Sequence, residues 1–569
     1  MENPPKIAAP RPWKDFLRMK KFVRPYTWRL AAMLALSLAG SALGLAQPYL
    51  SKYLVDGALM RRDLQALSYS AILMFGATVL GFALTYISGL GYMRLSAAML
   101  FDMRQEVYRH LLTLSPRFHA RARLGDLVSR LNGDVAEVQR ISADSLLASI
   151  SNIVFAVGSL VMMIYLSWQL FIVGVVLVPL ATVLYRFYQV RLNQLALQVR
   201  ERSAAIGALF VDVLPGFRLV ACSNASGYEL ARFGTANQSF VARMLDFQKT
   251  SLMARTVPGT VLSAAAIAVF LFGGREIILG QLSIGTLVAF MAYHSRLLSP
   301  VQSLLGLSSA LSTARVSLGR VLELLDTDAE VRECEGALPI ATLTRQIQFK
   351  EVTLLQAGRA VLDRVSFVLP ANKWTVITGQ SGAGKSTIAD LLVRLYDPDH
   401  GQILVDGTDM RRLSMTDLRR TVMLIEQSPY LMHGTLHDNI AYARPGTPRA
   451  AVESAARGAG LADLLDRLPS GLDTEVGERG LTLSAGERQR VAIARAFLAK
   501  PEVLILDEPS AAIDAIHEEK LLLSLRREFA GKTIIAITHK LALVAEAGHV
   551  LRIENGRIAS SALVLGGAA

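Results

Sequence analysis

One stretch of the chain has the residue types and spacing of a phosphate-binding loop. WTVITGQSGAGKST, residues 374–387, contains the pattern G-x-x-x-x-G-K-[ST] from Gly379 to Ser386. Glycines let backbone N–H groups close around phosphates, the lysine reaches the terminal oxygens, and the serine hydroxyl can bind magnesium. An apolar strand before the loop and a helix after it complete the expected context. The predicted ligands are Gly379, Ser381, Gly382, Gly384, Lys385, Ser386 and Thr387.

A second stretch, LTLSAGERQR at residues 481–490, also has the composition of an anion site. It has the pattern of a helix start in which Ser484 caps the first turn and Gly486 keeps the backbone open to a ligand. Helix N-termini attract anions because their first N–H groups have no partner within the helix. A chain with one phosphate loop already has a phosphate site, so the purpose of this second one needs explaining.

Two further strand ends carry groups that can act on a bound phosphate. In VLILDEPS, four apolar residues deliver Asp507 and Glu508 to the carboxyl edge of a sheet. Asp507 can hold magnesium and Glu508 can polarise an attacking water. Alone, such a pair is more often a turn or a helix cap, but the phosphate loop favours the catalytic interpretation. His539 in IIAITHK, otherwise a structural histidine, can donate to a γ-phosphate or position the water.

The elements that hold these groups alternate between strands and helices. From about Thr342 the runs IQFKEVTLL, WTVITGQ, TVMLIEQ, VLILDEP and TIIAITHK predict strands separated by helices. We therefore expect an α/β domain around a mainly parallel sheet over residues 342–569. The polar run DTDAEVRECEG suggests a linker over residues 326–341.

The first part of the chain has the composition of an all-α membrane domain, predicted over residues 1–325. A membrane-crossing helix needs about 20 apolar residues. Six stretches meet or approach that length: Leu30–Leu50, Ala71–Leu90, Leu146–Leu166, Leu170–Leu184, Val257–Phe272 and Leu282–Leu298. The last contains His294 and Arg296 and is followed by Pro300, which suggests either a polar cavity or side chains paired with neighbouring groups.

Charge distribution predicts the orientation of these spans. The segment before the first span carries eight Lys and Arg residues, 91–145 carries eight and 186–256 carries nine, whereas the alternate connections carry three, none and one. Positive residues near span ends stay in the cytoplasm, so the N-terminus, both long connections and the α/β domain are expected there, in a multi-pass protein of the cytoplasmic (inner) membrane. The net charge of +13 is then mostly a membrane signature, and no nucleic acid is expected.

Several smaller features refine this picture. The two long connections have helical charge spacing, which favours helices extending into the cytoplasm over simple loops, with apices near residues 118–128 and 214–224. No removable signal peptide is expected before the first span. The two cysteines, Cys222 and Cys334, are far apart and are expected to be free thiols.

Taken together, these segments resemble those of ATP-binding cassette (ABC) transporters. GQSGAGKST, the glutamine of MLIEQSPYLMHGT, LTLSAGERQR, VLILDEPS, AAIDA and ITHK occur in the order found in that family's nucleotide-binding domain. GDLVSRLNGDV and GQLSIGTLVAFMAYHSRLLSPVQSL are similar to segments of the six-helix domain of its exporter type. The resemblance covers nearly the whole chain. It implies a half-transporter that uses ATP and Mg²⁺ to export a hydrophobic or amphipathic substrate, such as a lipid, drug or peptide, by alternating access within the membrane lipid.

The resemblance also explains the second anion site, because in this family two ATPase domains meet head to tail. It implies a homodimer in which each ATP lies between the phosphate loop of one chain and Ser484 and Gly486 of the other. Gln427 matches the glutamine that contacts magnesium and the transmembrane domain, and Asp514 matches a loop that crosses the dimer. The implied magnesium ligands are Ser386, Gln427 and Asp507.

The sequence departs from the family pattern at two places. The usual Leu-Ser-Gly-Gly-Gln has Ala485 and Glu487 at its third and fifth positions, although Ser484, Gly486 and Glu508 remain. The aromatic residue that normally stacks on adenine is replaced by Gln356.

Other functions stay open beside export. Some members of this architecture import metal chelates. A membrane receptor that binds ATP without turnover is expected to lack Glu508 or His539, and a soluble ABC ATPase lacks membrane spans. The transported substrate is not identified by the sequence.

Overall fold

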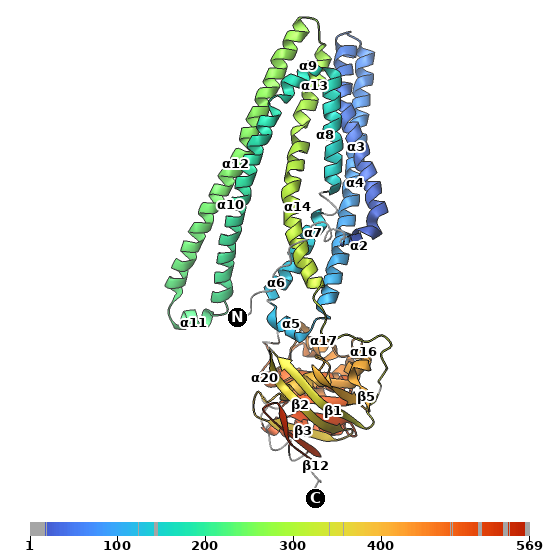
Figure 1. Ribbon diagram of the computed structural model, residues 1–569, viewed down its shortest axis with the longest axis vertical. Coiled ribbons are helices and arrows are strands. Elements are labelled where there is room, and N and C mark those ends of the chain that lie inside the picture. The colour runs from blue at the N-terminus through green and yellow to red at the C-terminus, as the bar shows by residue number, and fades with distance from the viewer. Residues whose placement is uncertain are drawn as a thin grey trace. The chain divides into compact units, whose positions relative to one another are not determined.

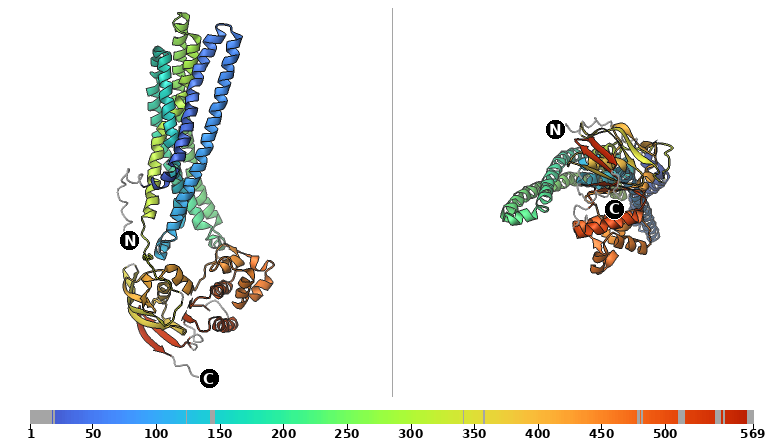
Figure 2. Two further views of the ribbon diagram at one scale, coloured as in Figure 1. Left: turned by 90° about the vertical axis from the view of Figure 1, so that its right-hand side faces the viewer. Right: turned by 90° about the horizontal axis from the view of Figure 1, so that it is seen from below.

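The protein is described here by a computed structural model that covers residues 18, 20–122, 124–141, 146–340, 342–356, 358–477, 480, 482–509, 515–538, 544 and 547–563. It divides into two compact units (Figures 1 and 2). The first comprises residues 1–110 and 124–326, and the second comprises residues 111–123 and 327–569. Each unit is described by itself.

Every regular element described in the first unit is a helix. Its elements, with the second unit's short α5 (Pro116–Arg121) excluded, are α2 (Lys20–Val23), η1 (Arg24–Tyr26), α3 (Thr27–Tyr53), η2 (Leu54–Leu59), α4 (Leu64–Leu111), α6 (Leu124–Ser129), η3 (Arg130–Asp134), α7 (Val135–Gln139), α8 (Leu146–Leu166), α9 (Trp168–Val175), α10 (Val178–Val213), α11 (Phe217–Cys222), α12 (Ser226–Ile278), α13 (Ile284–Arg296) and α14 (Leu298–Leu325). The predicted all-α first domain is therefore confirmed.

Among the described residues, five helical segments are long and apolar enough to cross a membrane. They are 20–59, 64–111, 148–166, 168–213 and 226–278. The sixth predicted stretch forms α13, which has only 13 residues, and the start of α14. The two helices meet at Leu297 because Pro300 has no N–H and its ring clashes with the carbonyl of residue 296, four positions earlier.

Two helices extend well beyond the length that a membrane requires. α10 has 36 residues and α12 has 53, and they lie side by side. The short α11 connects them at one end (Figure 1). α11 falls within the predicted apex at residues 214–224. The long connections are thus helical, as predicted, and simple loops are excluded for the second of them. Both cysteines are free and exposed, as expected.

The second unit contains three sheets. The strands of the largest, in spatial order, are β12 (Arg557–Leu563), β11 (His549–Glu554), β3 (Trp374–Gly379), β10 (Thr533–Ile537), β9 (Val503–Asp507) and β6 (Val422–Ile425). All its pairs are parallel except β11 with β12. An antiparallel sheet has the order β2 (Arg359–Pro370), β1 (Gln346–Gln356), β4 (His400–Val405) and β5 (Thr408–Asp409), and a small one pairs β7 (Gly434–Thr435) with β8 (Glu475–Val476).

Helices cover the parallel sheet, so its central strands are apolar along their length. All five residues of β10 are buried, as are the first four of β9. The helical elements of this unit are α5, α15 (Lys385–Leu392), η5 (Met410–Arg412), α16 (Met415–Thr421), α17 (Leu436–Ala441), α18 (Arg449–Gly458), α19 (Ala462–Arg467), η6 (Gly471–Asp473), α20 (Ala485–Ala499) and α21 (Ala515–Glu528). The predicted α/β domain with a mainly parallel sheet is confirmed.

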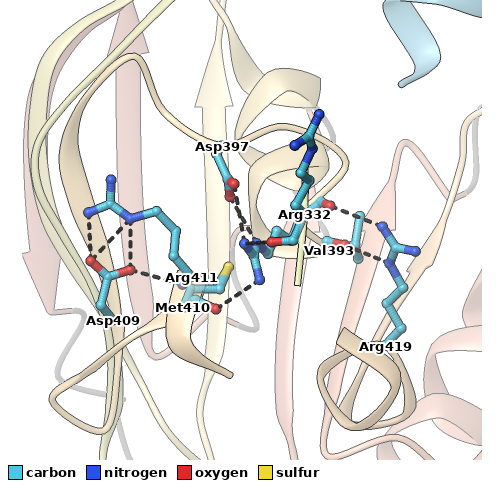
Figure 3. Close-up of polar contacts among 8 residues, drawn as sticks. Arg332, Val393, Asp397, Asp409, Met410, Arg411 and Arg419 are labelled. Atoms are coloured by element: carbon cyan, nitrogen blue, oxygen red, sulfur yellow. Dashed lines mark hydrogen bonds and ion pairs between the residues drawn. The ribbon is translucent and has the colours of Figure 1, made fainter. Parts of the chain in front are cut away.

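A buried arginine fixes the segment before β1 to the end of α15 (Figure 3). Arg394 is 2 % exposed; its guanidinium donates to Asp397 at 2.9 Å, to the carbonyl of Arg332 at 3.0 Å and to that of Met410 at 3.4 Å. Arg419 donates to the carbonyl of Arg394 at 3.0 Å. A buried charge is tolerated when it is paired and fully hydrogen-bonded, so these contacts attach residue 332 firmly to the helix that follows the phosphate loop.

Candidate nucleotide-binding site

The phosphate loop lies between the end of β3 and the start of α15. Gly379, Gly382 and Gly384 have φ values of 151°, 79° and 99°, a region that residues with a Cβ rarely adopt. A Cβ at Gly384 would lie 2.8 Å from Cδ2 of Leu362, and one at Gly379 would overlap the carbonyl oxygen of Ile553. Glycine is therefore required at both places, and a loop with these left-handed residues can form the concave nest of N–H groups that binds an anion.

The loop side chains differ in exposure in the way that their predicted roles require. Ser381, Gly382 and Ser386 are exposed, and Thr387 is half-buried. Lys385 is only 7 % exposed, and its Nζ donates to the carbonyls of Gly379 and Gln380, both at 2.8 Å. The ammonium group is thus held across the mouth of the loop, within reach of an anion bound there.

The carboxyl end of β9 brings Asp507 next to the loop. The Asp507 carboxylate hydrogen-bonds the side chain of Ser386; burial raises its pKa, and that hydrogen bond opposes the change. A hydroxyl and a carboxylate oxygen at one point are ligands that Mg²⁺ accepts. No group of three or more His, Cys, Asp or Glu side chains suited to a metal is found among the described residues. Magnesium sites built from one carboxylate plus substrate phosphates do not need such a group.

Glu508 adjoins Asp507 in an unusual backbone conformation. Its φ is 48°, and its N–H donates to the carbonyl of Ile537 at the end of β10 at 2.9 Å. Nε2 of Gln427, just after β6, donates to Oε2 of Glu508 at 2.7 Å. Strained residues held by their surroundings are concentrated at functional sites. The fold thus brings together two residues 81 positions apart, both of which were predicted site residues.

The second predicted anion site is the N-terminus of α20. Ser484 caps this helix in a capping box: its Oγ accepts from the N–H of Glu487 at 3.2 Å, and its own N–H donates to Oε2 of Glu487 at 2.7 Å. Arg467 also binds Glu487, at 2.6 Å. Glu487, which stands where the family pattern has glutamine, therefore stabilises the start of the helix. The S-x-x-E spacing of the sequence could have predicted this role. Gly486 is buried in the first turn.

Two predicted site residues, Asp514 and His539, lie outside the residues that the structure describes.

A further acidic group near the loop was missed by the sequence analysis. Asp390 lies in α15, and burial raises its pKa to about 6, with added effects from the charges of Glu426 and Asp507. Sequence alone offers no signal for this, because the shift depends on residues from three separate segments. Like charges gathered around a bound cation are expected at a magnesium site.

We expect this raised pKa to make stability depend on pH. In the folded chain the carboxyl of Asp390 has a pKa of about 6, against 3.8 for an ordinary aspartate side chain. Protonated Asp390 favours the folded state, so its contribution is fully present below about pH 4 and is lost as the pH rises through about 6. Asp390→Asn should remove this dependence and raise the thermal unfolding temperature at pH 7.5. Unfolding of the full-length protein in detergent with EDTA, between pH 4.5 and 7.5, measures this. Equal pH profiles for both proteins would contradict the expectation.

Gln356 ends β1, where it pairs with Arg359 across a tight hairpin, and its side chain is exposed. Beside it, Arg117 of α5 donates to the carbonyl of Leu355 at 3.0 Å and lies 4.7 Å from the ring centre of Tyr396. An amide side chain at this exposed edge offers less stacking surface than an aromatic ring.

We therefore expect Gln356→Tyr to tighten ATP binding. Stacking of an aromatic ring on a base contributes about 1 to 3 kcal/mol. The wild type should show a relatively high KM for ATP and measurable GTP hydrolysis, because its affinity comes mainly from the triphosphate. Competition between ATP and GTP on both proteins tests this. A strong ATP preference in the wild type, unchanged in the variant, would show that another group already stacks on the base.

Comparison with known proteins agrees with this geometry. Residues 30–301 match the family described as the ABC transporter transmembrane region, and residues 362–511 match the family described as ABC transporter. The chain is 31% identical to an ATP-dependent lipid A-core flippase of Aromatoleum aromaticum, over 95% of this chain and 92% of the relative. It is 28% identical to the flippase of the same name from Escherichia coli strain K12, over 96% of this chain and 94% of the relative.

A solved structure has the same overall architecture. The structure of a bacterial Atm1-family ABC exporter with ATP bound matches with a TM-score of 0.78 and 28% sequence identity, covering 95% of both chains. The chain belongs to the ABC transporter family. It is a multi-pass membrane protein with an ATP-binding ATPase domain, and its architecture is that of an ATP-driven exporter.

Proposed function

We propose that this protein exports a lipid-like amphiphile across the cytoplasmic membrane by alternating access. The relatives named above are flippases of a lipid, and the matched structure is an exporter. The observation that carries the ATP-dependent part is the meeting of the phosphate loop, Asp507, Glu508 and Gln427 at one edge of the parallel sheet. Import of a metal chelate and ATP binding without transport have no comparable support.

Within the site, we assign roles by chemistry. The phosphate loop and Lys385 bind the triphosphate, and Ser386, Asp507 and Gln427 hold Mg²⁺, which neutralises phosphate charge. Glu508 accepts a proton from the attacking water, and the Gln427 amide orients its carboxylate. By resemblance to the family, His539 assists at the γ-phosphate and Asp514 lies at the dimer contact.

The proposed arrangement of the chain follows the charge pattern and the family. Residues 1–325 form the transmembrane domain, 326–341 the linker and 342–569 the ATPase domain. The N-terminus and the ATPase domain face the cytoplasm. Two copies form a homodimer, and Ser484 and Gly486 of each copy complete the ATP site of the other, because the start of α20, where Ser484 is exposed, supplies N–H donors and a favourable dipole.

The transport function is tested in proteoliposomes that contain phospholipids with a fluorescent head group. ATP supplied on the side of the ATPase domain should move labelled lipid into the leaflet on the other side of the membrane. A membrane-impermeant quencher present on that other side should then quench a larger fraction of the label. Glu508→Gln protein should not move the labelled lipid in this way. An equal rate of lipid movement with and without ATP would overturn the proposed function.

Mixed dimers test the shared site. A dimer that combines a Lys385→Ala chain with a Ser484→Ala chain has both defects in one site and leaves the other intact. It should therefore keep more ATPase activity than a dimer in which both chains carry Lys385→Ala or both carry Ser484→Ala, because both sites are damaged in those dimers. Equal activity in all three would contradict sharing, and activity that requires a different subunit would contradict the homodimer.

A further inference from the structure

A cavity of about 590 Å³ lies within the first unit, among α8, α10, α12 and α13. Most of the residues that line it are aliphatic or small; its polar side chains are those of Thr182, Tyr185, Ser263, His294, Ser295 and Gln302. The volume falls within the range of small-molecule sites, about 300 to 1,000 Å³. The cavity is therefore large enough for a ligand and suited to an apolar one.

The cavity lies where helices are interrupted. α9 ends at Val175 and α10 begins at Val178, with a proline in its first turn; α12 contains the buried Pro258; and α13 gives way to α14 at Leu297. All four of these residues line the cavity. Proline removes a backbone donor and bends a helix, so these breaks separate the helices at one place. In membrane proteins, irregular backbone of this kind is tolerated where it borders protein or a cavity.

The imidazole of His294, which lines the cavity, uses only part of its hydrogen-bonding capacity. His294 is 8 % exposed, and its ring hydrogen-bonds the backbone of Gly174. A neutral imidazole has one donor and one acceptor. Since the donor serves the Gly174 carbonyl, the second ring nitrogen of this cavity-lining residue remains an acceptor. Ionisable residues within membrane spans commonly mark substrate paths.

The adjacent charged residue points to a different neighbour. Arg296 donates to the carbonyl of Gly44 at 3.1 Å and to Oε1 of Gln47 at 2.9 Å, both on α3. The cation is thus held by α3, away from the residues that line the cavity, and the cavity keeps its apolar character.

We propose that this cavity binds one hydrocarbon chain of the transported lipid, and that His294 accepts a hydrogen bond from a hydroxyl or amide group of that lipid. The proposal rests on the lipid export proposed above and adds its chain-binding site. Apolar walls suit the chain, while the acceptor on His294 favours lipids that carry a donor near the chain.

Photolabelling tests the site directly. The probe is a phosphatidylethanolamine with a diazirine in the middle of one acyl chain, added to the full-length protein in nanodiscs without nucleotide. Gly259→Phe fills the cavity, because a Cβ at this lining position meets nothing within 4 Å. Gly274→Phe is the matched control on the same helix, since its Cβ is equally unobstructed and residue 274 does not line the cavity.

Labelling of α10 and α13 peptides should be lost in Gly259→Phe, because the introduced ring takes the volume that the chain would occupy. It should be unchanged in Gly274→Phe, and labelling of α4 should be unchanged in both. Unaltered labelling of α10 and α13 in Gly259→Phe would overturn the site.

Lipid-stimulated ATPase activity tests whether the chain belongs to the transported lipid. Gly259→Phe should lose the stimulation, whereas Gly274→Phe should keep both the stimulation and the basal rate. Reduced labelling with full stimulation would assign the cavity to a resident lipid and overturn the proposal.

His294→Phe should weaken stimulation by lipids with a donor group. His294→Asn, which keeps an acceptor, should restore that stimulation; equal effects of both variants would overturn the histidine's role. If the wild type shows no ATP-driven lipid movement, the proposed function is wrong. The labelling result tests lipid binding in the cavity independently of that outcome.

Discussion

Glu508→Gln is expected to lower ATP hydrolysis by about 10²- to 10⁴-fold, the usual contribution of a general base. The amide preserves the shape of the side chain but cannot accept a proton from water. Oε2 of Glu508 already accepts a hydrogen bond from Gln427 at 2.7 Å, so the carboxylate is held in a defined position. ATP should still bind, because Lys385 and the loop are unchanged. Turnover and ATP binding of the purified protein measure the two effects separately.

A matched control lies at the other end of the same strand. Glu502 precedes β9, and its carboxylate pairs with Lys532 at 2.5 Å. Glu502→Gln also removes one carboxylate from this strand but should leave turnover near the wild-type rate. Near wild-type turnover in Glu508→Gln would mean that another group accepts the proton. Equal losses in both variants would point to a disturbed strand instead of lost catalysis.

Lys385→Ala is expected to weaken ATP binding by about 10- to 100-fold, because a charge-assisted hydrogen bond contributes about 1.5 to 3 kcal/mol. Hydrolysis should fall further, since positive charge at the terminal phosphate also stabilises the transition state. The effect should be large because Lys385 is 7 % exposed and its ammonium group is already held at the loop by two carbonyls. Equilibrium binding of ATP and single-turnover hydrolysis check both expectations.

The strand that leads into the phosphate loop, β3, offers a control for this variant. Lys373 precedes β3, at the end opposite the phosphate loop, and is exposed. Lys373→Ala should bind ATP like the wild type. Thermal unfolding without nucleotide must accompany the measurement, because Lys385→Ala leaves the carbonyls of Gly379 and Gln380 without this donor. Unchanged affinity in a folded Lys385→Ala protein would contradict the assignment of the loop.

Local features of the sequence determined much of this protein. The phosphate loop is contiguous, and its glycines are required by backbone geometry at positions 379 and 384, so the motif predicts the loop without knowledge of the fold. The apolar runs of β9 and β10 predict buried parallel strands because both faces of such a sheet are covered. The start of α20 is likewise local, since its cap joins residues three positions apart.

Only the tertiary structure decided features that join distant segments. The contact of Gln427 with Glu508 depends on the neighbouring positions of β6 and β9, and the raised pKa of Asp390 depends on burial beside charges from two other segments. The attachment of residue 332 to Arg394 and the cavity beside His294 arise in the same way. Helix and loop patterns follow from local backbone preferences, whereas burial, charge environment and empty volume follow from how separate elements pack, and no short window of sequence contains that information.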